Sequence, residues 1–90
     1  MMSETLQKKI DTRGRRQLAQ GMLTGQVEVL IRTEVPPSSQ QQRDLLASGC
    51  IVRSIVGNVL SAVVDVARLE EVAQLPIVRK IELSRPMFQE

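Results

Sequence analysis

The first clear pattern of apolar positions lies in the segment 27–35. Val27, Val29 and Ile31 occupy alternate positions, and the side chains of a β-strand point alternately to its two faces. A pair of prolines follows, beginning at Pro36, and proline has no backbone N–H to donate to a sheet. The pattern predicts a strand over residues 27–35 with one buried face.

The pattern changes to helical signals after the prolines. Ser38 is followed three residues later by Gln41, the spacing at which two side chains cap a helix N-terminus reciprocally. The helix would bury Leu45 and Leu46. It would stop at Gly49, since glycine readily adopts the left-handed conformation that ends helices. We therefore expect a short helix between Ser38 and Gly49.

Two further apolar runs, 50–56 and 59–66, meet at a Gly-Asn pair. Both residue types tolerate positive φ, so Gly57 and Asn58 between β-branched runs predict a tight β-hairpin. Alternation in the second run separates two faces that both carry valine. The sequence therefore predicts two adjacent antiparallel strands, the second with apolar residues on both faces.

A short amphipathic segment and a last strand follow the hairpin. Asp65 is placed to cap the N-terminus of a helix, and Pro76 closes that helix. The apolar stripe of the helix consists of Leu69, Val72 and Ala73. Residues 77–83 form the last predicted strand. The pattern does not decide which face of this strand is buried, because Ile81 falls on one face and Val78 on the other.

The elements follow one another in the order strand, helix, strand, strand, helix, strand. This order is that of the split βαβ, or ferredoxin-like, arrangement. We therefore predict an α+β domain over residues 26–84, in which a four-stranded antiparallel sheet carries two helices on one face. Residues 1–25 precede it as an arm, and residues 85–90 follow it as an extended tail. Since this fold serves many functions, function must be argued from particular residues and surfaces.

The arm carries most of the charge imbalance of the chain. Its basic residues are Lys8, Lys9, Arg13, Arg15 and Arg16, against Glu4 and Asp11. The rest of the chain is close to neutral, because the net charge of the whole is only +2. Sparse apolar residues predict a flexible or partly helical arm, mobile or ordered by a partner. Its charge would suit phosphates or acidic surfaces, although a solvated segment is the commoner meaning.

Candidate catalytic chemistry is sparse. The chain has no histidine, and so lacks the usual general base, the commonest metal ligand and any Ser-His or Cys-His pair. Its single cysteine, Cys50, opens an apolar run, where a packing role is expected. The glycines match neither a phosphate loop nor a dinucleotide fingerprint. We predict a protein that is not an enzyme and that binds no metal or cofactor.

No apolar run approaches the roughly 20 residues that a membrane-spanning helix needs. The first residues also lack an apolar stretch of signal-peptide length. The sequence therefore predicts a cytoplasmic protein without a membrane partner.

Two helices cover only one face of a four-stranded sheet, so the other face is expected to lie open. An exposed apolar sheet surface usually signals association, although small domains always leave some valine in water. We favour a docking surface on this face. Its predicted residues are Leu30, Arg32, Arg53, Val59, Ser61 and Val63.

The tail holds a proline and two large apolar side chains after the last predicted strand. One interpretation is a frayed terminus. The functional interpretation is an extended strand bound in the cleft of another protein, with side chains in alternate pockets. The residues assigned to this cleft-binding tail are Arg85, Pro86, Met87, Phe88, Gln89 and Glu90.

A resemblance to a known family lies in the stretch GCIVRSIVGNVLSAVVDVARLEEVAQLPIVRKIELSRP. It resembles the N-terminal prodomain of subtilisin-like serine proteases, a family that includes free-standing proteinase inhibitors. Members show a glycine before a β-branched strand, a hairpin, a short helix ending in Leu-Pro and a Val-x-x-Ile-Glu strand. Here these elements are residues 49–56, Gly57-Asn58, residues 69–76 and residues 78–82. The likeness spans about residues 26–86, and its motifs are mostly structural.

The resemblance implies a mechanism. In such prodomains the open sheet face packs on two surface helices of the protease, and the C-terminal tail enters the active-site cleft as a product-like strand. The resemblance thus implies an inhibitor and folding chaperone of a subtilisin-like serine protease, with residues 85–90 in the non-primed subsites. The arm of residues 1–25 is not part of the family pattern.

Two other functions stay open. The open sheet could belong to a self-associating or small-ligand regulatory module. Such a module would form a homo-oligomer whose stability does not change when the tail is deleted. Nucleic-acid binding through the basic arm is the least favoured, because RNA-reading sheets of similar topology stack bases on aromatic residues. The only aromatic residue of this chain is Phe88, outside the predicted sheet.

Overall fold

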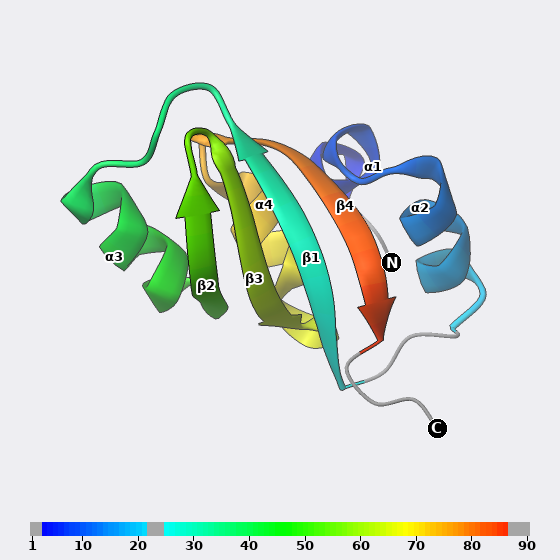
Figure 1. The fold of residues 1–90 in the computed structure, drawn as a ribbon. Coiled ribbons are helices and arrows are strands. Elements are labelled where there is room, and N and C mark those ends of the chain that lie inside the picture. Colours follow the sequence, from blue (N-terminus) through cyan, green and yellow to red (C-terminus); the bar gives the residue numbers. More distant parts are fainter. Residues whose placement is uncertain (1–2, 22–24, 87–90) are drawn as a thin grey trace.

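The computed structural model describes residues 3–21 and 25–86 (Figure 1). Its α-helices are α1 (Glu4–Lys9), α2 (Thr12–Ala19), α3 (Ser39–Ala47) and α4 (Leu69–Gln74). Its strands are β1 (Gln26–Thr33), β2 (Cys50–Val56), β3 (Val59–Asp65) and β4 (Val78–Pro86), and a 3₁₀ turn, η1 (Val66–Arg68), leads into α4. The sheet and the helices make an α+β fold, which is the predicted class.

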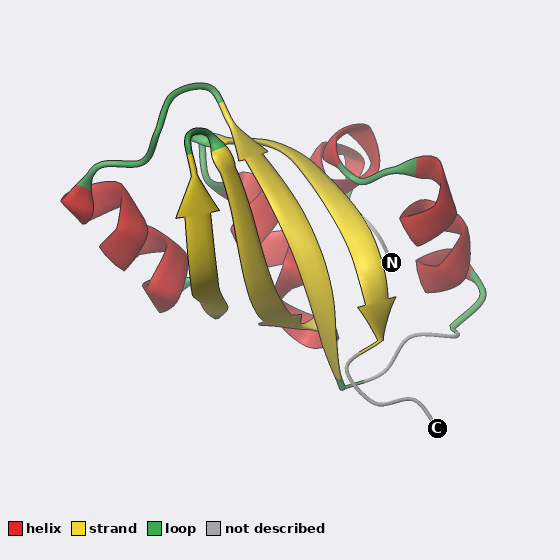
Figure 2. Cartoon of the chain, in the orientation of Figure 1, coloured by secondary structure: helices red, strands yellow, loops and turns green. Residues whose placement is uncertain are grey.

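The four strands form one open antiparallel sheet in the order β2-β3-β1-β4 (Figure 2). β1 and β3 lie in the centre, so β2 and β4 are the two edges. From β1 onward the elements follow the predicted order of strand, helix, strand, strand, helix, strand. The structure adds two helices, α1 and α2, in front of them.

The alternation that predicted β1 places one face of the sheet in the core. Val27, Val29 and Ile31 are all buried. Ile31 lies opposite Leu60 of β3 and Ile81 of β4, which are buried with it. α4 covers this face (Figure 1), and burial of its apolar stripe is the main force that holds it there. The members of that stripe, Leu69, Val72 and Ala73, are buried as predicted.

The hairpin between β2 and β3 has the predicted two-residue turn. Gly57 has a φ of 61°, while no other residue type among those described has a positive φ, so only the first turn residue is left-handed. Glycine at that position is typical of a type II′ turn. The Asn58 side chain donates through Nδ2 to the Thr33 carbonyl at 3.0 Å, which ties the turn to the end of β1.

The N-terminus of α3 has the predicted capping box. Ser38 Oγ accepts from the Gln41 N–H at 3.2 Å, and Gln41 Oε1 accepts from the Ser38 N–H at 2.8 Å. Gly49 follows the helix with a φ of 99°, as expected of a residue that ends it. Leu45 is fully buried, but the prediction that Leu46 is buried is wrong, since it is 62% exposed. α3 packs mainly on β2, and neighbouring helix positions, about 100° apart, do not both face one strand.

The inward face of β4 is set by an irregularity in its pairing with β1. The register shifts between Arg32 and Thr33, and both Val78 and Ile81 are fully buried. A regular strand does not bury two residues that are three positions apart on one face. The bulge therefore explains why the sequence pattern did not decide this face. β4 also continues to Pro86, beyond its predicted end.

The segment before β1 is folded onto the sheet domain. At the start of α1, the Ser3 N–H donates to Glu70 Oε2 at 2.6 Å. At its end, Lys9 Nζ donates to the Ala73 carbonyl at 2.7 Å. Since both contacts are made to α4, α1 lies beside α4.

The structure differs here from the separate arm that the sequence suggested. Residues 3–21 are largely helical, but they pack on the domain instead of extending from it. Leu6 and Ile10 are only 3% and 2% exposed and belong to the hydrophobic core. Their spacing of four residues is a helical signal, yet it does not reveal which distant residues they contact.

Between α1 and α2 the chain follows the outer edge of β4. Ile10 forms a parallel bridge with Ile81. α2 then packs against β4 at Gly14, where a Cβ atom would lie 2.9 Å from Leu83 Cγ. Such an approach requires a residue without a side chain. One edge of the sheet is therefore covered, while the other edge, β2, has β3 as its single strand neighbour among the described residues.

Candidate protein-docking surface

The face of the sheet opposite α4 carries the candidate docking surface. Residues that lie opposite each other in a sheet share a face, so the register identifies its members. Leu30 lies opposite Ser61 of β3 and Glu82 of β4, and Arg32 lies opposite Val59 of β3. Along β1 these positions alternate with the buried ones. Their side chains therefore point away from the core.

The structure brings together five of the six side chains predicted for this surface. They are Leu30 and Arg32 on β1, and Val59, Ser61 and Val63 on β3. Val63 is only 6% exposed, so it offers little area to an external partner. The sixth residue, Arg53, is the extra residue of a bulge between Val52 and Ser54 and is exposed on the edge strand β2.

Two apolar side chains of β2 belong to the same face and were not predicted from the sequence. Val56 is 76% exposed and lies opposite Val59, and Ile51 is 51% exposed and lies opposite Val63. A signal was available for Val56, because a two-residue turn beginning at Gly57 places positions 56 and 59 opposite each other. We call the resulting surface the open face: Leu30, Arg32, Ile51, Val56, Val59, Ser61, Val63 and Glu82.

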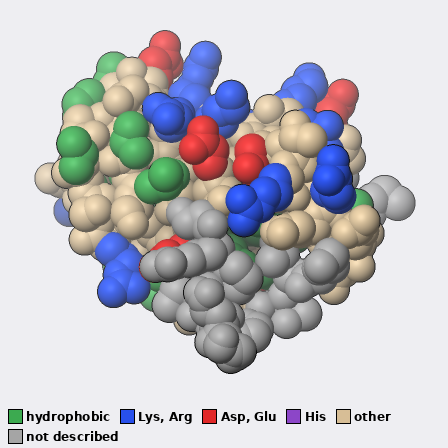
Figure 3. Space-filling model, turned by 45° about the vertical axis from the view of Figure 1, so that its right-hand side comes forward, with side chains coloured by type: hydrophobic (Ala, Val, Ile, Leu, Met, Phe, Trp, Pro, Cys, Tyr) green, Lys and Arg blue, Asp and Glu red, His purple; other side chains and the backbone are tan. Residues whose placement is uncertain are grey.

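Charged side chains flank the apolar part of the open face. Arg32 Nε lies 3.4 Å from Glu82 Oε2, across β1 and β4. Both side chains are partly exposed, so the pair adds at most about 1 kcal/mol to stability. Figure 3 shows hydrophobic side chains on the upper left of the molecule and charged ones at the top, on the right and at the lower left. Exposed apolar side chains next to charged ones are typical of a protein-docking patch.

Cys50 has the predicted packing role. Its side chain is fully buried in the core, and this burial raises the pKa of the thiol to about 11, because a thiolate is costly away from water. A protonated, buried thiol is a poor nucleophile. Within the described ranges, histidine, cysteine, aspartate and glutamate side chains form no group of three that could hold a metal ion.

The start of the predicted tail belongs to the sheet. Within β4, Arg85 lies opposite Glu28 and Pro86 lies opposite Val27. β4 thus runs past the predicted domain boundary at residue 84, because its pairing with β1 continues. The other four predicted tail residues, Met87, Phe88, Gln89 and Glu90, lie outside the residues that the structure describes.

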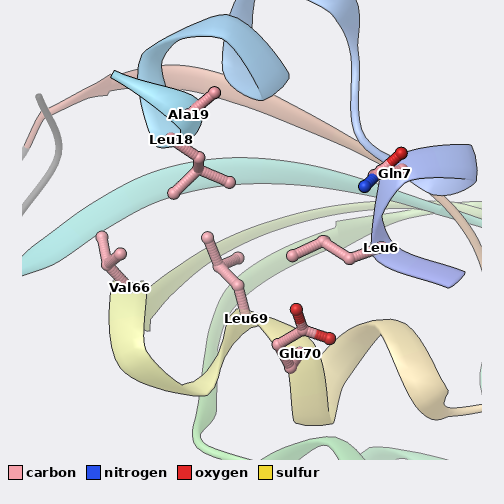
Figure 4. A pocket seen from close by; sticks show the side chains of 7 residues that line it. All are labelled: Leu6, Gln7, Leu18, Ala19, Val66, Leu69 and Glu70. Carbon is pink, nitrogen blue, oxygen red and sulfur yellow. The ribbon is translucent and has the colours of Figure 1, made fainter. Parts of the chain in front are cut away.

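A hollow of about 560 Å³ lies on the helix side of the sheet, between α1, α2 and the start of α4 (Figure 4). Its apolar walls are Leu6, Leu18, Val66 and Leu69, and Gln7 and Glu70 are polar residues beside them. The Glu70 carboxylate already accepts from the Ser3 N–H. No sequence pattern predicted the hollow, because its walls combine residues from both ends of the chain. It is separate from the open face, which lies across the sheet.

No helix in residues 3–21 or 25–86 is both long and apolar enough to cross a membrane. Comparison of the chain with protein-family models, with curated proteins and with solved structures found no match in any of the three.

Proposed function

We propose that this protein is a non-enzymatic inhibitor of a subtilisin-like serine protease, a folding chaperone for it, or both. The open face docks on the protease, and the residues after β4 enter its active-site cleft. The observation that carries the proposal is the exposed apolar part of the open face, where Val56 and Ile51 of β2 are 76% and 51% exposed. Apolar side chains gathered on one face favour association with another protein.

We further propose that residues 26–86 have the ferredoxin-like arrangement. The order β2-β3-β1-β4, with every neighbouring pair antiparallel, supports it, as does the order of helices and strands. α4 covers the face opposite the open face, so the open face is left for a partner, as the resemblance to the prodomain family implies. α1 and α2 are additions to that pattern.

The course of β4 supports the proposal that the residues after it enter the active-site cleft of the protease. β4 pairs with β1 on its inner side as far as Pro86, and Ile10 pairs with it at Ile81 on the outer side. The pairing with β1 therefore fixes the direction of β4 up to its last residue. Extended segments bind protein clefts through main-chain hydrogen bonds, with alternate side chains in pockets. Residues 87–90 are the segment that binds in this way.

A chaperone role follows from the same contact. A partner that binds the folded protease but not its unfolded chain stabilises the folded form by mass action. The open face supplies a preformed apolar surface, since its central strands β1 and β3 are held on both sides by other strands. Inhibition and assisted folding are therefore two results of one interface.

The test is inhibition of purified subtilisin-type proteases, followed with a small chromogenic substrate. A variant that lacks residues 87–90 keeps all of β4, whereas a cut after Ser84 would also remove the pairing of Arg85 and Pro86 with β1. We expect the full chain to inhibit, and the shortened chain to inhibit at least about 10-fold more weakly. Circular dichroism checks that both are folded. A folded full chain that inhibits none of a panel of such proteases overturns the proposal.

The same exposed side chains favour one other function, which is self-association. A second copy could cover Val56 and Ile51 by packing face to face in a symmetric dimer. Sedimentation at several concentrations separates the two functions. A stable dimer that forms equally well without residues 87–90, from a chain that inhibits no protease, favours the regulatory module. Cytoplasmic location remains a prediction from the sequence.

A further inference from the structure

Three exposed arginines cover the outer side of α2. Arg13, Arg15 and Arg16 are exposed, and within the described part of the chain none of them makes an ion pair or a side-chain hydrogen bond. Asp11, the carboxylate nearest to them in sequence, is turned to its own helix, where it accepts from the Gly14 N–H at 3.1 Å. We call the three side chains the arginine face.

The fold itself does not account for the arginine face. Positive charge in the first turn of a helix opposes the helix dipole, and Arg13 lies there, two residues after the Asp11 cap. Gly14 also weakens a helix, but the close contact with Leu83 requires it. No such packing reason applies to the three exposed arginines. Arg16, in the last turn, suits the helix dipole, so only Arg13 departs from local helix preferences, and such a departure without a structural reason points to a functional surface.

The helix that carries the arginine face, α2, packs on β4 near the end of that strand. α2 packs on β4 at Gly14, where a Cβ atom would come within 2.9 Å of Leu83 Cγ. Leu83 is close in sequence to Pro86, the last residue of β4. In Figure 1, α2 flanks β4 on the side away from β1. A protein that holds the residues following β4 in its cleft is therefore adjacent to α2, whose outer side carries the arginine face.

We propose that the arginine face is a second docking site for the same protease, and that it binds a carboxylate-rich surface next to the active-site cleft. This inference rests on the proposed function and names the chemistry of the partner. Arginine binds carboxylates through paired hydrogen bonds, and Arg13 and Arg16, one helical turn apart, present two such groups side by side. Because α2 is fixed at Asp11 and Gly14, little backbone freedom is lost on binding.

Protein carboxylates fit this surface better than nucleic-acid phosphates do. The described part of the chain contains no aromatic side chain on which a base could stack. α2 has only eight residues, and the net charge of the chain is only +2, whereas nucleic-acid binding draws on many phosphate contacts. A partner already held by the open face needs only a local cluster of carboxylates.

The test measures the rate at which the full chain associates with a subtilisin-type protease of acidic isoelectric point. The variant Arg13→Glu/Arg15→Glu/Arg16→Glu is expected to associate about 10- to 100-fold more slowly at low salt. The difference is expected to vanish at about 1 M salt, where the Debye length falls to roughly 3 Å. The variant Arg13→Lys/Arg15→Lys/Arg16→Lys keeps the charge and is expected to retain most of the rate.

Single substitutions provide a matched control. Arg16→Glu and Arg43→Glu each change one exposed helical arginine and alter the net charge equally. Arg43 lies on α3, which packs on β2 at the opposite edge of the sheet. Only Arg16→Glu is expected to slow association. Circular dichroism and urea unfolding show that each variant keeps the fold.

Two outcomes distinguish this inference from the proposed function. If the full chain inhibits but charge reversal of the arginine face leaves the association rate unchanged, the inference is overturned and the proposed function stands. If the folded full chain inhibits no protease, both are overturned. Fluorescence anisotropy with a single-stranded oligonucleotide tests whether the arginine face binds nucleic acid instead of a protein. Tight binding that the triple glutamate variant loses, with an unchanged protease rate, assigns the arginine face to nucleic acid instead.

Discussion

The Asp11 N–H donates a hydrogen bond to the Ile81 carbonyl at 3.0 Å and so joins the N-terminal region to the last strand. The bond lies on the outer edge of β4, next to the parallel bridge between Ile10 and Ile81. An uncovered edge strand pairs readily with other chains, and here the N-terminal region closes one of the two edges. The segment before β1 is therefore part of the folding unit.

Truncation of Ile10 tests this contribution. The side chain is 2% exposed and packs in the core, so we expect Ile10→Ala to lower the free energy of unfolding by about 2–4 kcal/mol. Leu46→Ala removes a similar volume from a side chain that is 62% exposed. It should change the free energy of unfolding by less than about 0.5 kcal/mol. Urea unfolding followed by circular dichroism measures both. Equally small effects would mean that the N-terminal region is not docked in solution.

Interactions between residues close in sequence made much of the fold predictable. The capping box of Ser38 and Gln41 and the turn at Gly57 each depend on residues a few positions apart. The alternation around Val29 likewise follows from the geometry of a single strand. For this reason the central strands, the cap and the hairpin could all be identified without knowledge of the tertiary structure.

What escaped prediction depends on contacts between distant segments. Leu46 is exposed because α3 packs on an edge strand, and Val78 faces inward because β4 is bulged against β1. Leu6 becomes a core residue only when α1 meets α4. The candidate site follows the same rule. Alternation placed Val59 on the open face, but Ile51 joins it only because of the bulge between Val52 and Ser54.

Gly14 is predicted to tolerate no side chain. A Cβ atom would lie 2.6 Å from Asp11 Oδ1 and 2.9 Å from Leu83 Cγ, which forces α2 away from β4. We expect Gly14→Ala to lower the free energy of unfolding by about 1–3 kcal/mol, although alanine is the better helix former by roughly 1 kcal/mol. Arg15→Ala, at an exposed position of the same helix, is the control. A Gly14→Ala variant that is more stable than the parent in thermal unfolding contradicts the packing of α2 on β4.

The buried Cys50 thiol is predicted to reduce stability in alkaline solution. Its pKa is raised from the ordinary value of 9.0 to about 11, so the folded state holds this proton more tightly than the unfolded state. The stabilising contribution is fully present below pH 9 and is lost as the pH rises through about 11. The shift corresponds to a loss of about 2–3 kcal/mol.

Comparison with Cys50→Ala isolates this contribution. The pKa of Lys9 is lowered by burial and by the nearby Arg79 charge, but this effect is common to both proteins and cancels. Urea titrations between pH 9 and 11 should show a shallower decline in the free energy of unfolding for Cys50→Ala than for the parent. Identical slopes would exclude a buried thiol that stays protonated in the folded state.

Substitutions of Val56 and Val35 distinguish docking through the open face from a general effect of exposed apolar side chains on inhibition. Both valines are exposed, by 76% and 54%, but Val56 lies on the open face, opposite Val59, whereas Val35 lies in the loop after β1. We expect Val56→Asp to weaken protease inhibition about 10- to 100-fold, because an unpaired carboxylate is costly to bury in an interface. Val35→Asp should leave the inhibition constant unchanged.

The two valine variants also decide which part of the protein dominates binding. Both side chains already face water, so neither substitution should lower the free energy of unfolding by more than about 1 kcal/mol, and a change in inhibition then reports the interface. Unchanged inhibition by both variants would place the binding energy in the residues after β4 alone. Equal weakening by both would mean that the protease contact is not confined to the open face. Weakening by Val56→Asp alone is the result that the proposed docking geometry requires.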